Sequence, residues 1–162
     1  LREAGFTNGF KTTLWHLFDQ RISRLAQALQ SDLAAVGVEV ELHPATTTVI
    51  WDAVGNRRVA PMSISAWNVT IPDPKDSLGL LLHTRSIADS GSMNQAFYSN
   101  PAVDRLLDEA SRAFEPALRA SLYRQAEERV VEDAPWVFQG SMNLFCLRQP
   151  WLKGSLMDAV AW

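Results

Sequence analysis

The chain has 162 residues, of which 47% are hydrophobic and 20% are charged, and its formal net charge is -3. A chain of this length and composition can bury a core, so it belongs with globular rather than disordered proteins. The 15 Lys and Arg residues are scattered and form no basic stripe, which excludes a nucleic-acid surface as the leading interpretation. No apolar run approaches the roughly 18 residues that a membrane-spanning helix needs.

The first predicted elements alternate between strand and helix. Residues 10–17 are a predicted strand, and Asp19 can cap the helix that follows. Apolar side chains recur in that helix at spacings of three and four, and Gly37 ends it: Ile22, Leu25, Ala26, Leu29, Leu33 and Val36. Residues 38–42 then alternate between apolar and acidic, as in a half-buried strand. A strand, a helix and a second strand form a βαβ unit, which predicts parallel pairing.

Residues 46–57 predict a second helix, and residues 61–67 a third strand. One face of this helix is expected to be apolar: Val49, Ile50, Ala53 and Val54. The resulting β-α-β-α-β order indicates an α/β fold with an open, mainly parallel sheet flanked by helices. A short helix over 76–83 and a long polar loop over 86–98 follow.

Two more helices are predicted in the second half. Asn100 and Pro101 supply a cap and a first-turn proline for one, and Glu115 and Pro116 begin the other. The positions expected to face the core are Val103, Leu106, Leu107 and Ala110 in the first, and Leu118, Leu122, Ala126 and Val130 in the second. Residues 136–147 are interpreted as one or two strands.

Residues for metal binding or catalysis are sparse. The histidines lie far apart, at no metal-ligand spacing: His16, His43 and His83. With Cys146 as the single cysteine, no metal and no cofactor is expected. Ser92, His83 and Asp89 could be assembled into a nucleophile-base-acid set, but solvated loop residues are the simpler interpretation. An enzyme and a bare interaction domain therefore remain as alternatives to a binding protein without catalysis.

Five segments occur in an order typical of one family: "LREAGFTNGF" at 1–10, "AQALQSDLAAVGVEVEL" at 26–42, "SAWNVTIPDP" at 65–74, "GSMNQAFYSNPAVDRLLDEASR" at 91–112 and "LYRQAEERVVEDAPWVF" at 122–138. The most specific combination is the stretch from Asn94 to Asp104 followed by the helix and stop from Tyr123 to Pro135. With these segments the chain resembles the C-terminal lobe of the extracytoplasmic solute-binding proteins of peptide and nickel ABC transporters, family 5.

The resemblance implies one lobe of a type II periplasmic-binding-protein fold. Residues 1–145 would be this lobe, the N-terminal lobe would be absent from this fragment, and residues 146–162 would be a tail that packs with it. The implied protein is not an enzyme: its two lobes close over a peptide or peptide-like solute and deliver it to an ABC permease in the membrane. It would be periplasmic, or extracytoplasmic and lipid-anchored. Without its partner lobe, the exposed apolar surface near Trp151 and Trp162 is expected to favour self-association.

The resemblance also points to a ligand-binding loop after the third strand. Peptide-binding members commonly carry Trp-x-x-Asp-x-x-Asp-Pro there, and the first Asp pairs with the ammonium group of the peptide. This chain has Trp67, Thr70 and Asp73 at the corresponding positions. A buried ammonium without a charged partner is costly. Either the ligand is not an ordinary short peptide, or Asp73 takes the ammonium, although Asp73 is also placed to cap the next helix.

The expected ligand contacts are therefore Trp67, Asn68, Val69, Thr70 and Asp73, together with Trp51 from the second helix. The tryptophans offer flat apolar faces with an N–H donor, and packing in the core is the alternative for both. Other solutes remain open: a nickel chelate, near which His43 is a weak candidate, an oligosaccharide or another small molecule.

Overall fold

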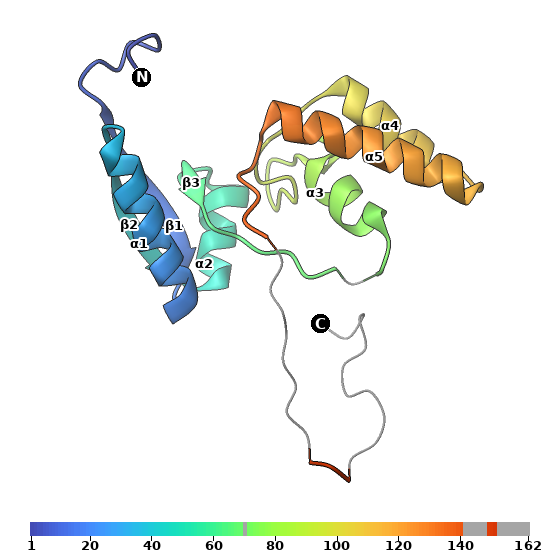
Figure 1. Cartoon of the computed structure of the whole chain (residues 1–162), viewed down its shortest axis with the longest axis horizontal. Coiled ribbons are helices and arrows are strands. Elements are labelled where there is room, and N and C mark those ends of the chain that lie inside the picture. The colour runs from blue at the N-terminus through green and yellow to red at the C-terminus, as the bar shows by residue number, and fades with distance from the viewer. Residues whose placement is uncertain (70, 141–148, 152–162) are drawn as a thin grey trace. The chain divides into compact units, whose positions relative to one another are not determined.

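The computed structural model describes residues 1–69, 71–140 and 149–151. Thr70, Cys146 and most of the predicted tail, Trp162 included, lie outside the described residues. The chain divides into two compact units: Leu1–Ala66 with Ala88–Ser92, and Trp67–Ile87 with the residues from Met93 onward. The first unit holds the sheet, and the second is built from helices and loops (Figure 1).

The sheet of the first unit has three parallel strands. The central strand β1 (Phe10–Leu17) pairs with β2 (Val38–Ala45) on one side and β3 (Met62–Ser63) on the other. The helix α1 (Gln20–Ala35) connects β1 to β2, as the βαβ pattern predicts. The α/β class and the parallel sheet flanked by helices are thus confirmed.

Helix α1 begins and packs as its sequence predicts. The Asp19 carboxylate accepts hydrogen bonds from the backbone N–H groups of Arg21 (2.9 Å) and Ile22 (3.2 Å), which satisfies donors at the helix start. The apolar face of α1 covers one face of the sheet. The shared core consists of buried Leu14, Ala26, Val38 and Val40, with Leu29, Leu33, Leu42, Met62 and Ile64 packed against it.

Two glycines bring the starts of β1 and β2 close together. Gly9 and Gly37 have positive φ angles of 74° and 88°, and the Phe10 N–H donates to the Gly37 carbonyl over 3.2 Å. A Cβ atom on Gly9 would lie 1.8 Å from the Gly37 oxygen. Position 9 therefore needs glycine for both its backbone conformation and its close approach.

The third strand is shorter than predicted. The interpretation of 61–67 as a strand is wrong beyond its first residues, since only Met62–Ser63 pair, and Ile64 adds one bond from its N–H to the Trp15 carbonyl (2.8 Å). The pairing places Met62 opposite Leu14 and Ser63 opposite Trp15, although β1 itself continues to Leu17. The chain has already entered the second unit at Trp67.

The predicted second helix is α2 (Thr47–Trp51), continued by a π-helical turn (Asp52–Asn56). Ile50, Ala53 and Val54 are buried, as predicted, but Val49 is 48% exposed and its assignment to the apolar face is wrong.

The second unit contains the remaining helices. A π-helical turn (Lys75–Gly79) leads into the short helix α3 (Leu80–Leu82), close to the predicted range. Helices α4 (Pro101–Arg112) and α5 (Pro116–Asp133) lie side by side (Figure 1). Both begin at the predicted prolines and receive the predicted caps from Asn100 and Glu115.

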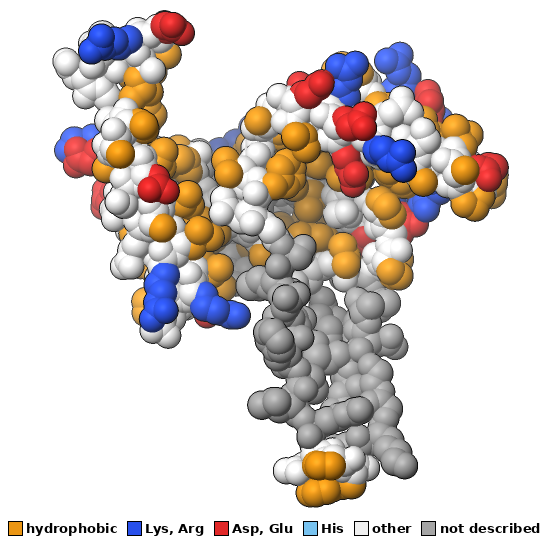
Figure 2. Space-filling view, viewed as in Figure 1, with side chains coloured by type: hydrophobic (Ala, Val, Ile, Leu, Met, Phe, Trp, Pro, Cys, Tyr) orange, Lys and Arg blue, Asp and Glu red, His pale blue; other side chains and the backbone are white. Residues whose placement is uncertain are grey.

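The core of the second unit lies between α3, α4 and α5. Its buried members are Leu81, Leu82, Val103, Leu107, Ala110, Leu122, Tyr123, Ala126 and Val130. Leu118 was expected among them but is 54% exposed, because it lies near the start of α5, beyond the packed stretch. The space-filling view shows side chains of both charge signs over the face formed by α4 and α5 (Figure 2).

The strands predicted over 136–147 are absent from the described part of this range. Residues 136–140 have no regular secondary structure, and 141–147 lie outside the described residues. Within the described ranges, no helix combines the length and the apolar character needed to cross a membrane.

Candidate functional site

Trp67 begins the loop in the second unit that the sequence marks as ligand-binding. Its ring is half-buried against the core of the second unit. Its indole N–H donates to the Asp76 carboxylate over 3.4 Å. Core packing, the alternative weighed for Trp67, is therefore part of its role, and ligand contact by the remaining exposed part of the ring stays a prediction.

Asp73 is held by two kinds of contact. Its Oδ1 accepts a hydrogen bond from the Lys75 backbone N–H (2.9 Å), which is the predicted capping contact. Its two carboxylate oxygens each lie 2.8 Å from Nη2 of Arg119 on α5. The Lys75 N–H lowers the pKa of Asp73, partial burial opposes this, and Arg119 lowers it further. Asp73 is thus a partnered, negatively charged group.

Arg119 joins the loop to both long helices. Its Nε donates to the Ala110 carbonyl at the end of α4 over 3.2 Å. Its Nη2 lies 3.3 Å from the Tyr123 hydroxyl, and its guanidinium carbon lies 5.1 Å from the centre of the Tyr123 ring. The pKa of Arg119 is raised chiefly by its hydrogen bond to Asp73. No signal in the sequence identifies this arginine, since it lies 46 residues from its partner.

The middle of the loop is open to solvent. Asn68, Val69, Ile71 and Pro72 are exposed, while Thr70 lies outside the described residues. The accessible side chains of this stretch therefore offer an amide and apolar groups.

Trp51 lines a hollow in the first unit. The hollow has a volume of about 580 Å³, and its walls are Thr47, Thr48, Trp51, Asp52, Gly55, Asn56, Gly91 and Ser92. The Asn56 carboxamide shapes one wall, because its oxygen accepts hydrogen bonds from the Ser90 hydroxyl and the Gly91 N–H. The predicted exposure of Trp51 to a concave surface is consistent with this geometry.

Sequence reasoning missed the polar neighbours of Trp51. Positions 47, 48, 51, 52, 55 and 56 recur at helical spacing, so a polar and small-residue face opposite the buried Ile50 could have been found from the sequence. The contribution of Gly91 and Ser92, which return from a distant loop, could not.

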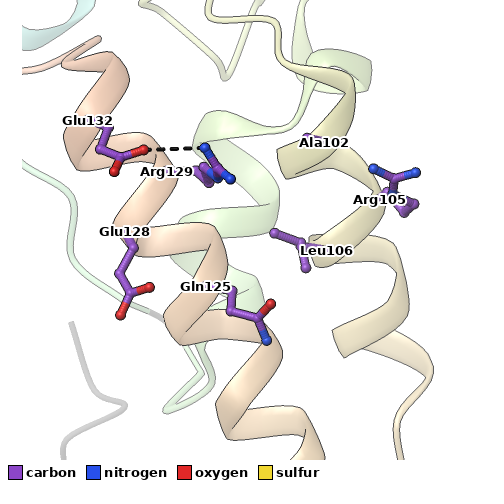
Figure 3. Close-up of a pocket in the computed structure, with 7 residues that line it drawn as sticks. All are labelled: Ala102, Arg105, Leu106, Gln125, Glu128, Arg129 and Glu132. Atoms are coloured by element: carbon purple, nitrogen blue, oxygen red, sulfur yellow. Dashed lines mark hydrogen bonds and ion pairs between the residues drawn. The ribbon is translucent and has the colours of Figure 1, made fainter.

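A second hollow lies between α4 and α5, with a volume of about 390 Å³ (Figure 3). Leu106 points from α4 toward α5, and charged side chains surround it. Arg129 forms an ion pair with Glu132 over 3.4 Å. Exposed pairs of this kind are typical of a solvated helix face, so we assign this groove no ligand.

Asn94 and Tyr98 hold the long loop in place. Asn94 is fully buried, and its amide nitrogen donates to the carbonyls of Tyr98 (2.8 Å) and His83 (3.3 Å). The Tyr98 hydroxyl donates to the Asp133 carboxylate, which also accepts from Asn100.

Two of the three histidines, His83 and His43, contact residues of their own unit. His83 is buried, its Nδ1 accepts from the Arg85 N–H over 3.1 Å, and its ring approaches Asp104. His43 stacks on Trp15 with ring centres 5.0 Å apart. His83 belongs to the second unit, whereas Ser92 and Asp89, its proposed catalytic partners, belong to the first. Over the described ranges no group of three or more His, Cys, Asp or Glu residues is arranged to bind a metal ion.

These features can be compared with known proteins. A family model described as bacterial extracellular solute-binding proteins, family 5 Middle, matches residues 1–89, more than half of the 162-residue chain. The chain belongs to this family. The suspected family is therefore confirmed, and with it membership in a class of extracytoplasmic solute-binding proteins.

The names of the relatives give different solutes. The chain is 31% identical over 159 residues to the glutathione-binding protein GsiB of Pectobacterium atrosepticum, covering 95% of this chain and 31% of that protein. It is 30% identical over 164 residues to heme-binding protein A of Haemophilus influenzae, covering 95% of this chain and 28% of that protein. The chain thus spans less than a third of the length of these relatives.

Solved structures of family members share the fold. The periplasmic binding protein DppA of Helicobacter pylori, in complex with the peptide STSA, is 30% identical with a TM-score of 0.78, covering 85% of this chain and 26% of that one. A dipeptide-binding protein of Pseudoalteromonas sp. SM9913, in complex with Met-Leu, is 27% identical with a TM-score of 0.73, covering 82% and 27%. The periplasmic-binding-protein fold is therefore shown.

Proposed function

We propose that this chain is part of the solute-binding component of an ABC importer, and that the whole protein binds a peptide or peptide-like solute between two lobes. The observation that carries the proposal is the likeness, over 85% of the chain, to a binding protein solved with a peptide. In this proposal residues 1–145 form the C-terminal lobe, and the closed protein delivers its solute to a membrane permease. The protein is periplasmic or lipid-anchored outside the cytoplasm.

Each described unit carries proposed ligand contacts of its own. In the first unit, Trp51 offers its ring at the hollow. In the second unit, the loop offers Trp67, Asn68, Val69 and Thr70. Stacking on an aromatic face combined with a few hydrogen bonds is a common way to hold a small solute. A role without catalysis is supported by the family, which is described as one of solute-binding proteins.

Two classes of solute are compatible with this function. Thr70 stands where peptide-binding relatives commonly carry the aspartate that pairs with a peptide ammonium, so a ligand without that group is the second candidate. The named ligands of relatives, glutathione and heme, show that the family accommodates more than ordinary peptides.

The experiment is native mass spectrometry of the full-length protein purified from its own extracytoplasmic compartment. We expect a bound solute whose mass identifies its class. Trp51→Ala should lower the affinity for this solute by about tenfold, since a lost aromatic contact costs on the order of 1–2 kcal/mol. Phe114→Ala, which alters a fully exposed aromatic side chain outside the proposed contacts, is the matched control. A protein that carries no solute and binds none from its native extract would contradict the proposal.

A further inference from the structure

The loop from Trp67 to Asp76 is attached to the helical unit at two points. At its start, Trp67 packs on the core and donates to Asp76 (3.4 Å). At its end, the carboxylate of Asp73 lies 2.8 Å from Arg119 through each of its oxygens. The exposed residues Asn68, Val69 and Ile71 lie between these two attachments.

We propose that Arg119 is the positioning residue of this loop, and that by holding Asp73 it takes that carboxylate away from a ligand cation. A ligand ammonium then finds no free partner in Asp73. This inference rests on the proposed function, because it takes residues 67–70 as ligand contacts. It assigns Asp73 to Arg119 and not to a ligand ammonium.

The geometry favours Arg119 over a simple surface ion pair. Its guanidinium is fixed from three sides, by the Ala110 carbonyl (3.2 Å), the Tyr123 hydroxyl (3.3 Å) and the Tyr123 ring (5.1 Å). The side chains of Arg119 and Asp73 are only 30% and 31% exposed. A cation whose rotamer is already fixed loses little further entropy when it binds the carboxylate, so it can determine where the loop lies.

The same geometry makes Asp73 a poor partner for a ligand ammonium. Both oxygens already lie against Arg119, and Oδ1 also accepts the Lys75 N–H (2.9 Å). A ligand ammonium would have to approach a carboxylate whose charge is compensated, and would meet the positive charge of Arg119 beside it. Amide, hydroxyl and apolar ligand groups meet no such repulsion.

Hydrogen exchange tests the positioning role without any ligand. Three amides of the loop report directly, because the N–H groups of Asp73, Lys75 and Asp76 donate to Ile71, Asp73 and Asp73, respectively. In the full-length protein, Arg119→Met should accelerate exchange at these amides by about tenfold. Asp73→Asn should act in the same direction, and the double variant should add nothing further, because both changes remove one interaction. Arg119→Lys keeps the charge and should restore part of the protection.

The matched control is Arg129→Met, which removes an arginine from the same helix whose partner is Glu132 and not the loop. It should leave the three amides unchanged. If Arg119→Met leaves their exchange unchanged, the positioning role is wrong. If it accelerates exchange equally at buried α5 positions such as Val130, Arg119 is a general stabilising residue and the role is also wrong. Should Arg119→Met fail to fold, Arg119→Lys decides by the same criteria.

Calorimetric titration with Ser-Thr-Ser-Ala and its N-acetyl form tests the charge argument. The wild type should bind the acetylated peptide at least as tightly as the free one. Arg119→Met frees the Asp73 carboxylate, so the ratio of affinities should shift about tenfold toward the free amine. An unchanged ratio, or a wild-type preference for the free amine that Asp73→Asn abolishes, would overturn the charge argument. Binding of neither peptide would count against the peptide part of the proposed function, while hydrogen exchange still decides the role of Arg119.

Discussion

At the scale of single residues, buried polar groups decide how the loops of the second unit run. Asn94 is the clearest case, because its carboxamide both donates to and accepts from the backbone of Tyr98 and donates to the carbonyl of His83. A buried amide with all its partners in place stabilises one loop conformation, whereas losing a partner leaves an unsatisfied group at a cost of about 1–3 kcal/mol. The same logic applies to Asp73 and Arg119 in the proposed ligand-binding loop.

Tyr98 predicts a pH dependence. Partial burial, and then the hydrogen bond to Asp133, raise the pKa of Tyr98 from 10.0 to about 12. A group whose pKa is higher in the folded state stabilises fully below its unfolded pKa, and that contribution is lost as pH rises through the folded value. The free energy of unfolding should therefore fall between pH 10 and pH 12, and Tyr98→Phe should flatten this fall.

Urea unfolding of both proteins at a series of pH values measures the difference. Tyr98→Phe keeps the ring and removes the ionisable hydroxyl, so parallel pH profiles for the two proteins would contradict the prediction.

Gly9 and Gly5 form a matched pair of positions with positive φ (74° and 84°). Gly5→Ala meets no atom within 4 Å, so its cost should be limited to the backbone conformation, about 1–2 kcal/mol. Gly9→Ala places a Cβ 1.8 Å from the Gly37 oxygen and must also displace the start of β1. We expect a loss of at least about 3 kcal/mol in unfolding free energy for Gly9→Ala. Equal losses for both would show that the contact with Gly37 does not matter.

At the scale of elements, the three long helices begin at cap residues that the sequence predicts, and packing decides which face of each helix is buried. Asp19, Asn100 and Glu115 cap α1, α4 and α5 as predicted. Leu118 and Leu122 lie one turn apart on α5, and the helical period assigns both to the core, yet only Leu122 is buried (8% exposed against 54%). The spacing of apolar residues along α5 carries no information about where its packing neighbours end.

This contrast predicts different costs for the same substitution. Leu122→Ala should lower the free energy of unfolding by about 2–4 kcal/mol, because it leaves a cavity in the core of the second unit. Leu118→Ala should change it by less than about 1 kcal/mol, since the side chain is already half in water. Chemical denaturation of the two variants measures both values. A large effect of Leu118→Ala would mean that α4 or another segment covers it in the folded protein.

At the scale of the whole molecule, this chain corresponds to less than a third of the length of its relatives. Two compact units carry the candidate contacts, Trp51 in the first and residues 67–73 in the second. Several apolar side chains near the end of the described chain are open to water, among them Val137 (81% exposed), Phe138 (56%) and Trp151 (72%). Water-exposed apolar surface of this kind is often covered by another part of a protein or by a second molecule.

We therefore expect the isolated chain to self-associate as its concentration rises. Phe138→Ser combined with Trp151→Ser should weaken this association, which sedimentation or light scattering can measure. Phe114→Ser is the matched control, because Phe114 is fully exposed at the turn between α4 and α5, away from these residues in the sequence. A monomer over a wide concentration range would contradict the prediction.

The sequence by itself determined the order of elements, because their signals are local. Strand alternation, helical spacing, cap residues and stop signals each act over a few positions, and so the starts of β1, α1, β2, α4 and α5 were predicted correctly, while β2 runs three residues beyond its predicted end. The family could also be predicted from the sequence, since the resemblance depends on short segments and on their order along the chain. Trp51 was named as a candidate contact because a tryptophan on a helix after a strand is visible without a structure, and its contact with a ligand stays a prediction.

Only the tertiary structure decided which of these residues meet. Asp73 could be read as a cap or as a ligand group, and the sequence did not indicate that Arg119, 46 residues away, would take its charge. The third strand was overestimated because an extended, apolar stretch does not show how many of its residues pair with a neighbouring strand. The hollow at Trp51 needs Gly91, which returns from a distant part of the chain. Such contacts depend on the path of the chain through space, which a pattern over a few neighbouring residues does not specify.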